Sequence, residues 1–182
     1  ATFGGRTVSF RNDATAPAGQ FVTGVFRADG ASQDVFVKMN SPQINAIQVS
    51  DLGEVAWTVR MNAGDESLVS TEGEPAYAYT PSAALTLDNG VAFAAAAAKQ
   101  NVWGDGDVTL EKKWSYSYSG FVDSSKTAVM SEKYGTLLNR GWYNLEDSSN
   151  AQTLTLGNLE AGCEYLVQLV LDDLRSGNRS DF

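Results

Sequence analysis

Two carboxylates two residues apart are the first residues in this sequence whose spacing could do chemistry. Asp105 and Asp107 lie in the Gly-Asp-Gly-Asp stretch at residues 104–107, and carboxylates so spaced can converge on a hard cation such as Ca²⁺. The stretch lacks the further spaced carboxylates of an EF-hand loop, and Gly and Asp are also typical of polar turns. A plain turn is therefore the favoured interpretation, with Ca²⁺ at Asp105 and Asp107 as the alternative.

Catalytic groups are scarce. The sequence contains no histidine, which excludes Ser-His and Cys-His catalytic pairs and histidine metal sites. A single cysteine, Cys163, excludes an internal disulfide and a cysteine zinc cluster. Asp172 and Asp173 could be a glycosidase pair, but adjacent strand residues point to opposite faces. The sequence therefore predicts a protein that is not an enzyme and has no cofactor.

Aromatic residues are the other candidates, because their rings can stack on sugars. Trp103 lies in an Asn-Val-Trp-Gly turn, and Trp142 and Tyr143 follow a predicted helix in what we expect to be a loop. These three are the candidate exposed contacts with carbohydrate, and closing the end of a sandwich is their alternative role. Residues 114–119 alternate three aromatics with three serines, a pattern for which a core role is favoured over a sugar platform.

The elements that must position these residues are mostly strands. Apolar and polar residues alternate with a period of two between turn residues, which favours an all-β antiparallel sandwich. One short helix is predicted after Ser131 and is expected to end at residues 139–141. The Asp-Gly and Asn-Gly pairs at residues 28–30 and 88–90 predict hairpin turns. The expected strands are residues 7–11, 20–28, 34–39, 44–50, 55–61, 76–79, 84–87, 91–95, 108–113, 115–121, 153–156 and 164–171.

Length and charge limit the class of protein. The 182 residues are enough for one domain. With 13 basic and 22 acidic residues, the net charge is −9, which makes nucleic acid an unexpected partner. The longest apolar run, residues 91–98, is far below the roughly 20 residues of a transmembrane helix. The sequence begins at Ala1 rather than methionine, so we expect a processed product or a fragment.

Several stretches resemble a known family. Tyr134, Leu137 and Leu138, then residues 153–162 and 164–175, are similar to a jelly-roll domain repeated in large secreted surface proteins of bacteria. Its opening strands resemble Trp57 and residues 70–73, 76–79 and 89–93. The resemblance covers most of the chain and implies a jelly-roll sandwich, akin to carbohydrate-binding modules, at the cell surface or outside the cell.

The order of these stretches differs from that of the family. Residues 19–30 and 44–49 resemble the closing strands of the domain, yet they come first. The resemblance thus implies one domain in permuted order, with closing strands in residues 1–51 and opening and central strands in residues 54–182. The closing strands carry the candidate assembly residues, which are Gln20, Val22, Phe26, Ile44, Ile47 and Val49.

A sandwich without its closing strands would expose unpaired backbone and an apolar face. Residues 1–51 could fill the gap in their own chain, or in a neighbour by donor-strand complementation, which would give a head-to-tail filament. The first functional hypothesis is therefore an extracellular structural subunit that assembles with copies of itself into a filament or surface array. The alternative is a carbohydrate-binding module that uses exposed aromatics to bind polysaccharide.

Overall fold

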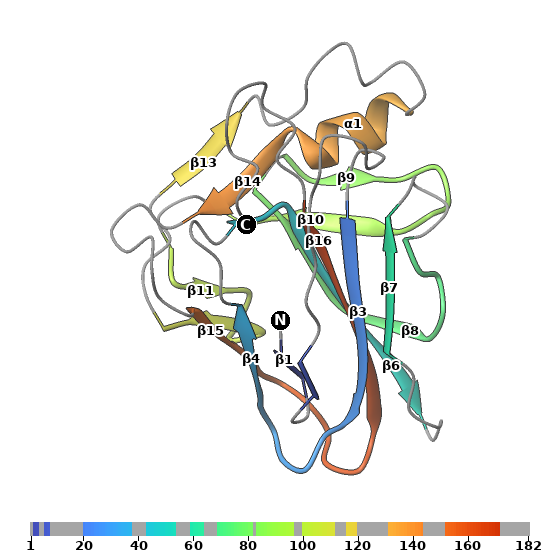
Figure 1. Ribbon diagram of the computed structural model, residues 1–182, viewed down its shortest axis with the longest axis vertical. Coiled ribbons are helices and arrows are strands. Elements are labelled where there is room, and N and C mark those ends of the chain that lie inside the picture. Colours follow the sequence, from blue (N-terminus) through green and yellow to red (C-terminus); the bar gives the residue numbers. More distant parts are fainter. Residues whose placement is uncertain are drawn as a thin grey trace.

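The computed structural model shows an all-β sandwich with one short helix, as the sequence predicts (Figure 1). Two sheets face each other, and a small third sheet and the helix lie at one end. The jelly-roll topology implied by the resemblance remains a prediction. The structure describes residues 2–3, 6–7, 20–37, 43–53, 59–63, 69–81, 83–96, 100–111, 116–119, 131–143 and 152–171.

The first sheet has six strands, and buried residues alternate with more exposed ones in the four strands where burial is described. Their order is β11 (Val102–Trp103), β12 (Val108–Leu110), β15 (Gln152–Leu156), β4 (Gln33–Val37), β1 (Thr2–Phe3) and β2 (Arg6–Thr7). All neighbours in this sheet are antiparallel. The buried positions of its strands are Val35, Val37, Trp103, Val108, Leu110, Leu154 and Leu156.

The second sheet has seven strands and is built around one strand that is buried on both faces. Their order is β7 (Val59–Ala63), β3 (Gln20–Arg27), β16 (Glu164–Leu171), β6 (Ala46–Gly53), β8 (Glu74–Thr80), β10 (Ala92–Ala95) and β9 (Leu85–Thr86). Only β8 and β10 pair in parallel among the described strands. In β16, Val167 and Leu169 face the space between the sheets, whereas Val170 faces the opposite side.

At one end, β13 (Tyr116–Ser119), β14 (Arg140–Tyr143) and β5 (Gln43–Ile44) form the third sheet, next to α1 (Glu132–Leu138) (Figure 1). The predicted helix is confirmed, and Ser131 is its N-cap, because Ser131 Oγ accepts a hydrogen bond of 3.1 Å from the Tyr134 N–H. Tyr134, Leu137 and Leu138 are buried in a second apolar cluster on the outer face of the seven-stranded sheet. No helix in the described part of the chain is long and apolar enough to span a bilayer.

Of the two predicted hairpin turns, one is confirmed and one is wrong. Residues 88–90 do form the turn of a hairpin, since β9 and β10 pair antiparallel. Residues 28–30, in contrast, connect β3 in one sheet with β4 in the other, so they form a crossing between sheets. The backbone of Ala28 bonds instead to Cys163 and Gly162, which lie in the turn before β16. The same local turn signal serves both arrangements because it carries no information about strand partners.

Candidate functional site

The predicted assembly strands lie at the centre of the seven-stranded sheet. β3 and β6 flank β16, so both neighbours of β16 come from residues 20–53. Val22 lies opposite Leu169 on one side, and Ile47 lies opposite the same Leu169 on the other. In this structure the closing strands therefore pair with strands of their own chain.

The side chains of these strands fill the space between the sheets. The candidate residues Val22, Phe26, Ile44, Ile47 and Val49 are all buried in the main apolar cluster. Phe26 stacks on the ring of Tyr165, its cross-strand partner, with ring centroids 5.9 Å apart. For Gln20, the described feature is its backbone register opposite Leu171. Removing this segment would take these side chains out of the core and leave both edges of β16 without strand partners.

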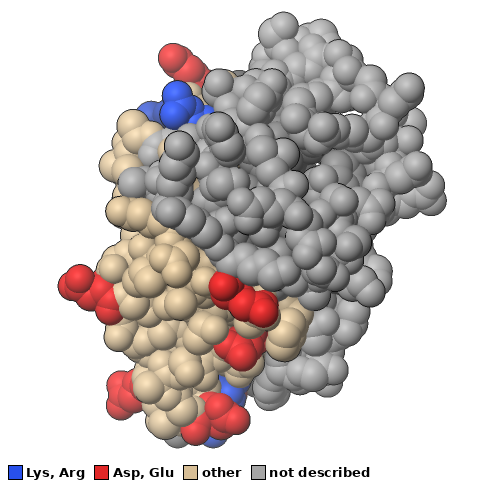
Figure 2. Space-filling view, turned by 90° about the vertical axis from the view of Figure 1, so that its left-hand side faces the viewer, with Lys and Arg blue, Asp and Glu red and all other residues tan. Residues whose placement is uncertain are grey.

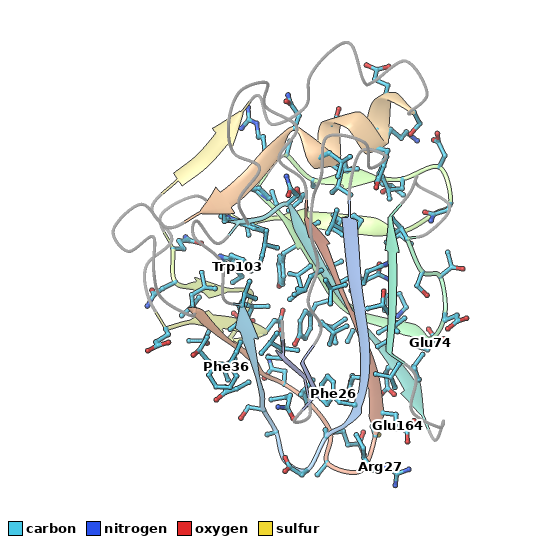
Figure 3. The ribbon with its side chains drawn as sticks, viewed as in Figure 1. Phe26, Arg27, Phe36, Glu74, Trp103 and Glu164 are labelled. Carbon is cyan, nitrogen blue, oxygen red and sulfur yellow. The ribbon has the colours of Figure 1, made fainter. Side chains whose placement is uncertain are left out.

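Two polar contacts also join the segment to the rest of the chain. Arg27 in β3 donates a hydrogen bond of 3.1 Å to Glu164 Oε1 in β16, and Figure 3 shows the two side chains at one end of the sheet. Glu164 is nearly fully buried, whereas Arg27 is half exposed. In the other sheet, β4 lies between β15 and β1, and Thr155 Oγ1 contacts Asp34 Oδ1 at 2.6 Å. The segment thus supplies inner strands to both sheets.

The expected exposure of Trp103 and Trp142 is wrong. Each residue is about 1% exposed, and the two rings stack with centroids 4.0 Å apart (Trp103 is labelled in Figure 3). The reason is that both residues belong to strands, β11 and β14, at positions that face the core. Their indole N–H groups have no hydrogen-bond partner in the described part of the protein. These rings are therefore unavailable to a sugar.

Tyr143, the third aromatic candidate, also belongs to strand β14 rather than to a loop. Its backbone lies opposite Tyr116 on one side and Gln43 on the other. Its side chain is outside the described part of the structure, as are Asp172 and Asp173. The prediction that Tyr143 contacts carbohydrate stays a prediction.

The Asp105 and Asp107 stretch forms a turn between β11 and β12 that is bound to other parts of the protein. Tyr79 donates a hydrogen bond of 2.5 Å to Asp107 Oδ2, and Asn158 Nδ2 donates one of 2.8 Å to Oδ1. Asn158 also donates to the backbone carbonyl of Asp105. Protein donors thus occupy both carboxylate oxygens of Asp107, which gives this residue a role in joining the two turns. Among the described residues, no three His, Cys, Asp or Glu side chains are grouped as metal ligands.

A hollow of about 570 Å³ lies beside this turn. Its lining includes Tyr77, Tyr79, Phe93 and Asp107, together with alanines of β8 and β10. Burial, and after it the Asp107 carboxylate, raise the pKa of Tyr77 well above its ordinary value. Burial and the hydrogen bond to Asp107 raise the pKa of Tyr79 in the same direction. Both phenols stay protonated at neutral pH, and their hydroxyls act as donors within the protein.

The outer face of the six-stranded sheet carries an exposed ring that sequence reasoning missed. Phe36 is 46% exposed and is the second-last residue of β4, and Val102 is 42% exposed on β11. A signal was present in the sequence, because Val35 and Val37 point inward and Phe36 must then point outward. Register places Thr153 directly opposite Phe36. Thr109 and Thr155 lie opposite each other on the same face.

No protein-family model, curated protein or solved structure matches the chain.

Proposed function

We propose that this chain is a non-catalytic structural subunit, outside the cell or on its surface, that assembles head to tail with copies of itself. Each copy would receive β3, β4 and β6 from its neighbour by donor-strand complementation. The observation that carries the proposal is the position of β16, because both of its neighbouring strands come from residues 20–53.

The pairing of β16 can form within a chain or between chains. Residues 54–58 are the only covalent connection between the segment up to β6 and the rest of the sandwich, which begins at β7. If the segment of one copy leaves its own sheet, the same hydrogen bonds and the same apolar contacts can form with the next copy. Exchange of identical elements needs no new interface, and a head-to-tail arrangement that does not close grows into a filament.

The composition supports a structural role. The chain lacks histidine, which serves as the base in most hydrolytic designs. The described carboxylate of Asp107 is occupied by protein donors, as is one oxygen of Glu164. These contacts use the charged groups to join strands and turns.

Cross-linking tests which chain supplies the closing strands. Asp34 and Thr155 lie opposite each other across β4 and β15, and both point outward. In a Cys163→Ser background, Asp34→Cys with Thr155→Cys should be bridged by a short bis-maleimide. If neighbours exchange the segment, denaturing gels will show a ladder that continues beyond two chains.

The matched control is Thr109→Cys with Thr155→Cys. These positions lie opposite each other across β12 and β15, which both belong to the remainder of the sandwich. This pair should be bridged within one chain in either arrangement. If Asp34→Cys with Thr155→Cys also gives only single chains, the segment completes its own domain and the proposal is wrong. A product that stops at two chains would contradict the filament.

A further inference from the structure

The outer face of the six-stranded sheet carries exposed apolar side chains next to threonine hydroxyls and one carboxylate. We define the platform as Phe36, Asp34, Thr153 and Thr155, with Thr109 and Val102 on the neighbouring strands β12 and β11. Phe36 and Val102 are the two large apolar side chains that are exposed in the described part of the chain, and both lie on this face. Figure 3 shows Phe36 on the side of β4 that points away from the core.

Strand register places the platform residues in two rows. Val102, Thr109, Thr155 and Asp34 lie opposite one another across four strands, and Thr153 lies next to Phe36 in the adjacent row. Neighbouring strands are about 4.8 Å apart, so the first row is about 14 Å long. This length suits several consecutive units of an extended polymer better than one small molecule.

The side chains offer both kinds of contact that a sugar needs. An exposed Phe ring can lie against the apolar face of a sugar ring, and a Phe side chain loses little rotamer freedom on binding. Thr hydroxyls can donate and accept hydrogen bonds. Thr155 Oγ1 is bonded to Asp34 Oδ1 at 2.6 Å, which fixes both groups and leaves further acceptor positions on the carboxylate.

The negative charge of the protein favours an uncharged polysaccharide over an anionic one. Asp34 is the charged residue of the platform, and the whole chain carries a net charge of −9. Figure 2 views the side of the molecule where these strands lie, and the described surface there is mostly uncharged, with scattered acidic groups and basic groups at its upper and lower ends. Carboxylates would repel a polyuronate or a sulfated glycan, whereas an uncharged chain brings hydroxyl donors to them.

We infer that the platform binds an uncharged polysaccharide in extended form, with Phe36 as the stacking residue. This function is independent of the proposed strand exchange, because all platform residues keep their positions whichever chain supplies β4. It also differs from binding through Trp103 or Trp142, whose rings are buried.

Co-sedimentation with insoluble glycans tests the inference. The full chain should bind swollen cellulose, mannan or xylan and should not bind polygalacturonate gel. Phe36→Ala should weaken binding by about tenfold or more, because it removes the stacking surface. Phe36→Trp should keep or strengthen binding, and Thr153→Val, which removes one hydroxyl without changing volume, should weaken it by a few fold.

Thr86→Val is the matched control, since Thr86 is an exposed threonine on β9 of the other sheet. It should bind like the unmodified chain, and urea unfolding should show that each variant is folded. The inference is wrong if no uncharged glycan is bound, or if Phe36→Ala binds as well as the unmodified chain. Equal binding to polygalacturonate would overturn the choice of an uncharged ligand. If Phe36→Ala only lowers the sedimentation coefficient of the free protein, the platform contacts a second copy instead.

Discussion

The side chain of Asp107 joins three parts of the molecule that are far apart in sequence. Its carboxylate accepts hydrogen bonds from Tyr79 in β8 and from Asn158 in the turn after β15. Gly104, in the same turn, has a φ of +60°, and a Cβ there would collide with the Tyr79 hydroxyl and the Asp107 carboxylate. The turn therefore has one shape, which depends on a glycine and on two donors.

Asp107→Asn should destabilise the fold and change its response to alkaline pH. It replaces a charge-assisted acceptor and leaves one donor badly paired, which costs about 1–2 kcal/mol. The raised pKa of Tyr79 means that, above the ordinary value of about 10, the unfolded chain loses a proton that the folded chain keeps. The contribution of Tyr79 to the free energy of unfolding is thus fully present below about pH 10 and is lost at higher pH. Between pH 8 and pH 11, urea unfolding should show that the free energy of unfolding falls less in Asp107→Asn than in the unmodified chain.

Tyr79→Phe is the control for this assignment, because it removes the titrating hydroxyl and leaves the ring in the core. Its stability should depend less on pH above about 10 than that of the unmodified chain. Equal pH dependence in all three proteins would show that Asp107 does not influence Tyr79.

At the scale of elements, Asn45 fixes how the helix end and two strands meet. It lies in the break between β5 and β6, fully buried, and its Nδ2 donates to the carbonyls of Leu138 at 2.8 Å and Arg140 at 2.9 Å. Its backbone N–H donates to the Val170 carbonyl at 2.8 Å. One side chain thus satisfies two carbonyls where α1 ends and β14 begins.

Asn45→Asp should lower the free energy of unfolding more at pH 7 than at pH 4. A carboxylate oxygen in place of the Nδ2 donor would face the carbonyls of Leu138 and Arg140 and repel them, which costs about 3 kcal/mol or more. This environment raises the pKa of the new carboxyl above its unfolded value, so the variant gains stability as pH falls and the acid becomes a donor. Chemical unfolding at both pH values measures the difference. Gln33→Ala removes an exposed side-chain amide that bonds to a backbone carbonyl, and it should change stability by less than about 0.5 kcal/mol.

Sequence patterns predicted where strands begin and end better than which strands and side chains lie next to each other. The expected strand at residues 164–171 is confirmed at both ends, and the strand expected at residues 20–28 ends one residue earlier, because alternation and apolar content are local signals. The two-residue strand β11 was missed since so short a strand carries no period. Trp103 and Trp142 are 39 positions apart, so nothing local indicates that they stack. The same limitation turned the crossing at residues 28–30 into an expected hairpin.

At the scale of the whole molecule, the chain divides into a segment and an incomplete sandwich. Residues 1–53 contain β1 to β6, and residues 54–182 contain β16 without either of its neighbours. β16 is buried on both faces. In residues 54–182 alone it would lack β3 and β6, and it would therefore expose apolar surface together with unpaired backbone groups. Neither part alone has a complete core.

We therefore expect that neither residues 1–53 nor residues 54–182 fold when expressed alone, and that the two pieces fold when they are expressed together. Residues 54–182 alone should be insoluble or lack a cooperative unfolding transition, whereas co-expression with a tagged 1–53 segment should give a soluble complex with one transition. A segment with Val22→Asp and Ile47→Asp should not rescue, because each carboxylate would be buried opposite Leu169 without a partner. Affinity capture and circular dichroism of the melted complex measure both outcomes. If residues 54–182 fold unaided, the segment is not needed to complete the sandwich, and the proposed division of the chain is wrong. If the segment never binds in trans, neighbours cannot exchange it, since exchange requires binding across separate chains.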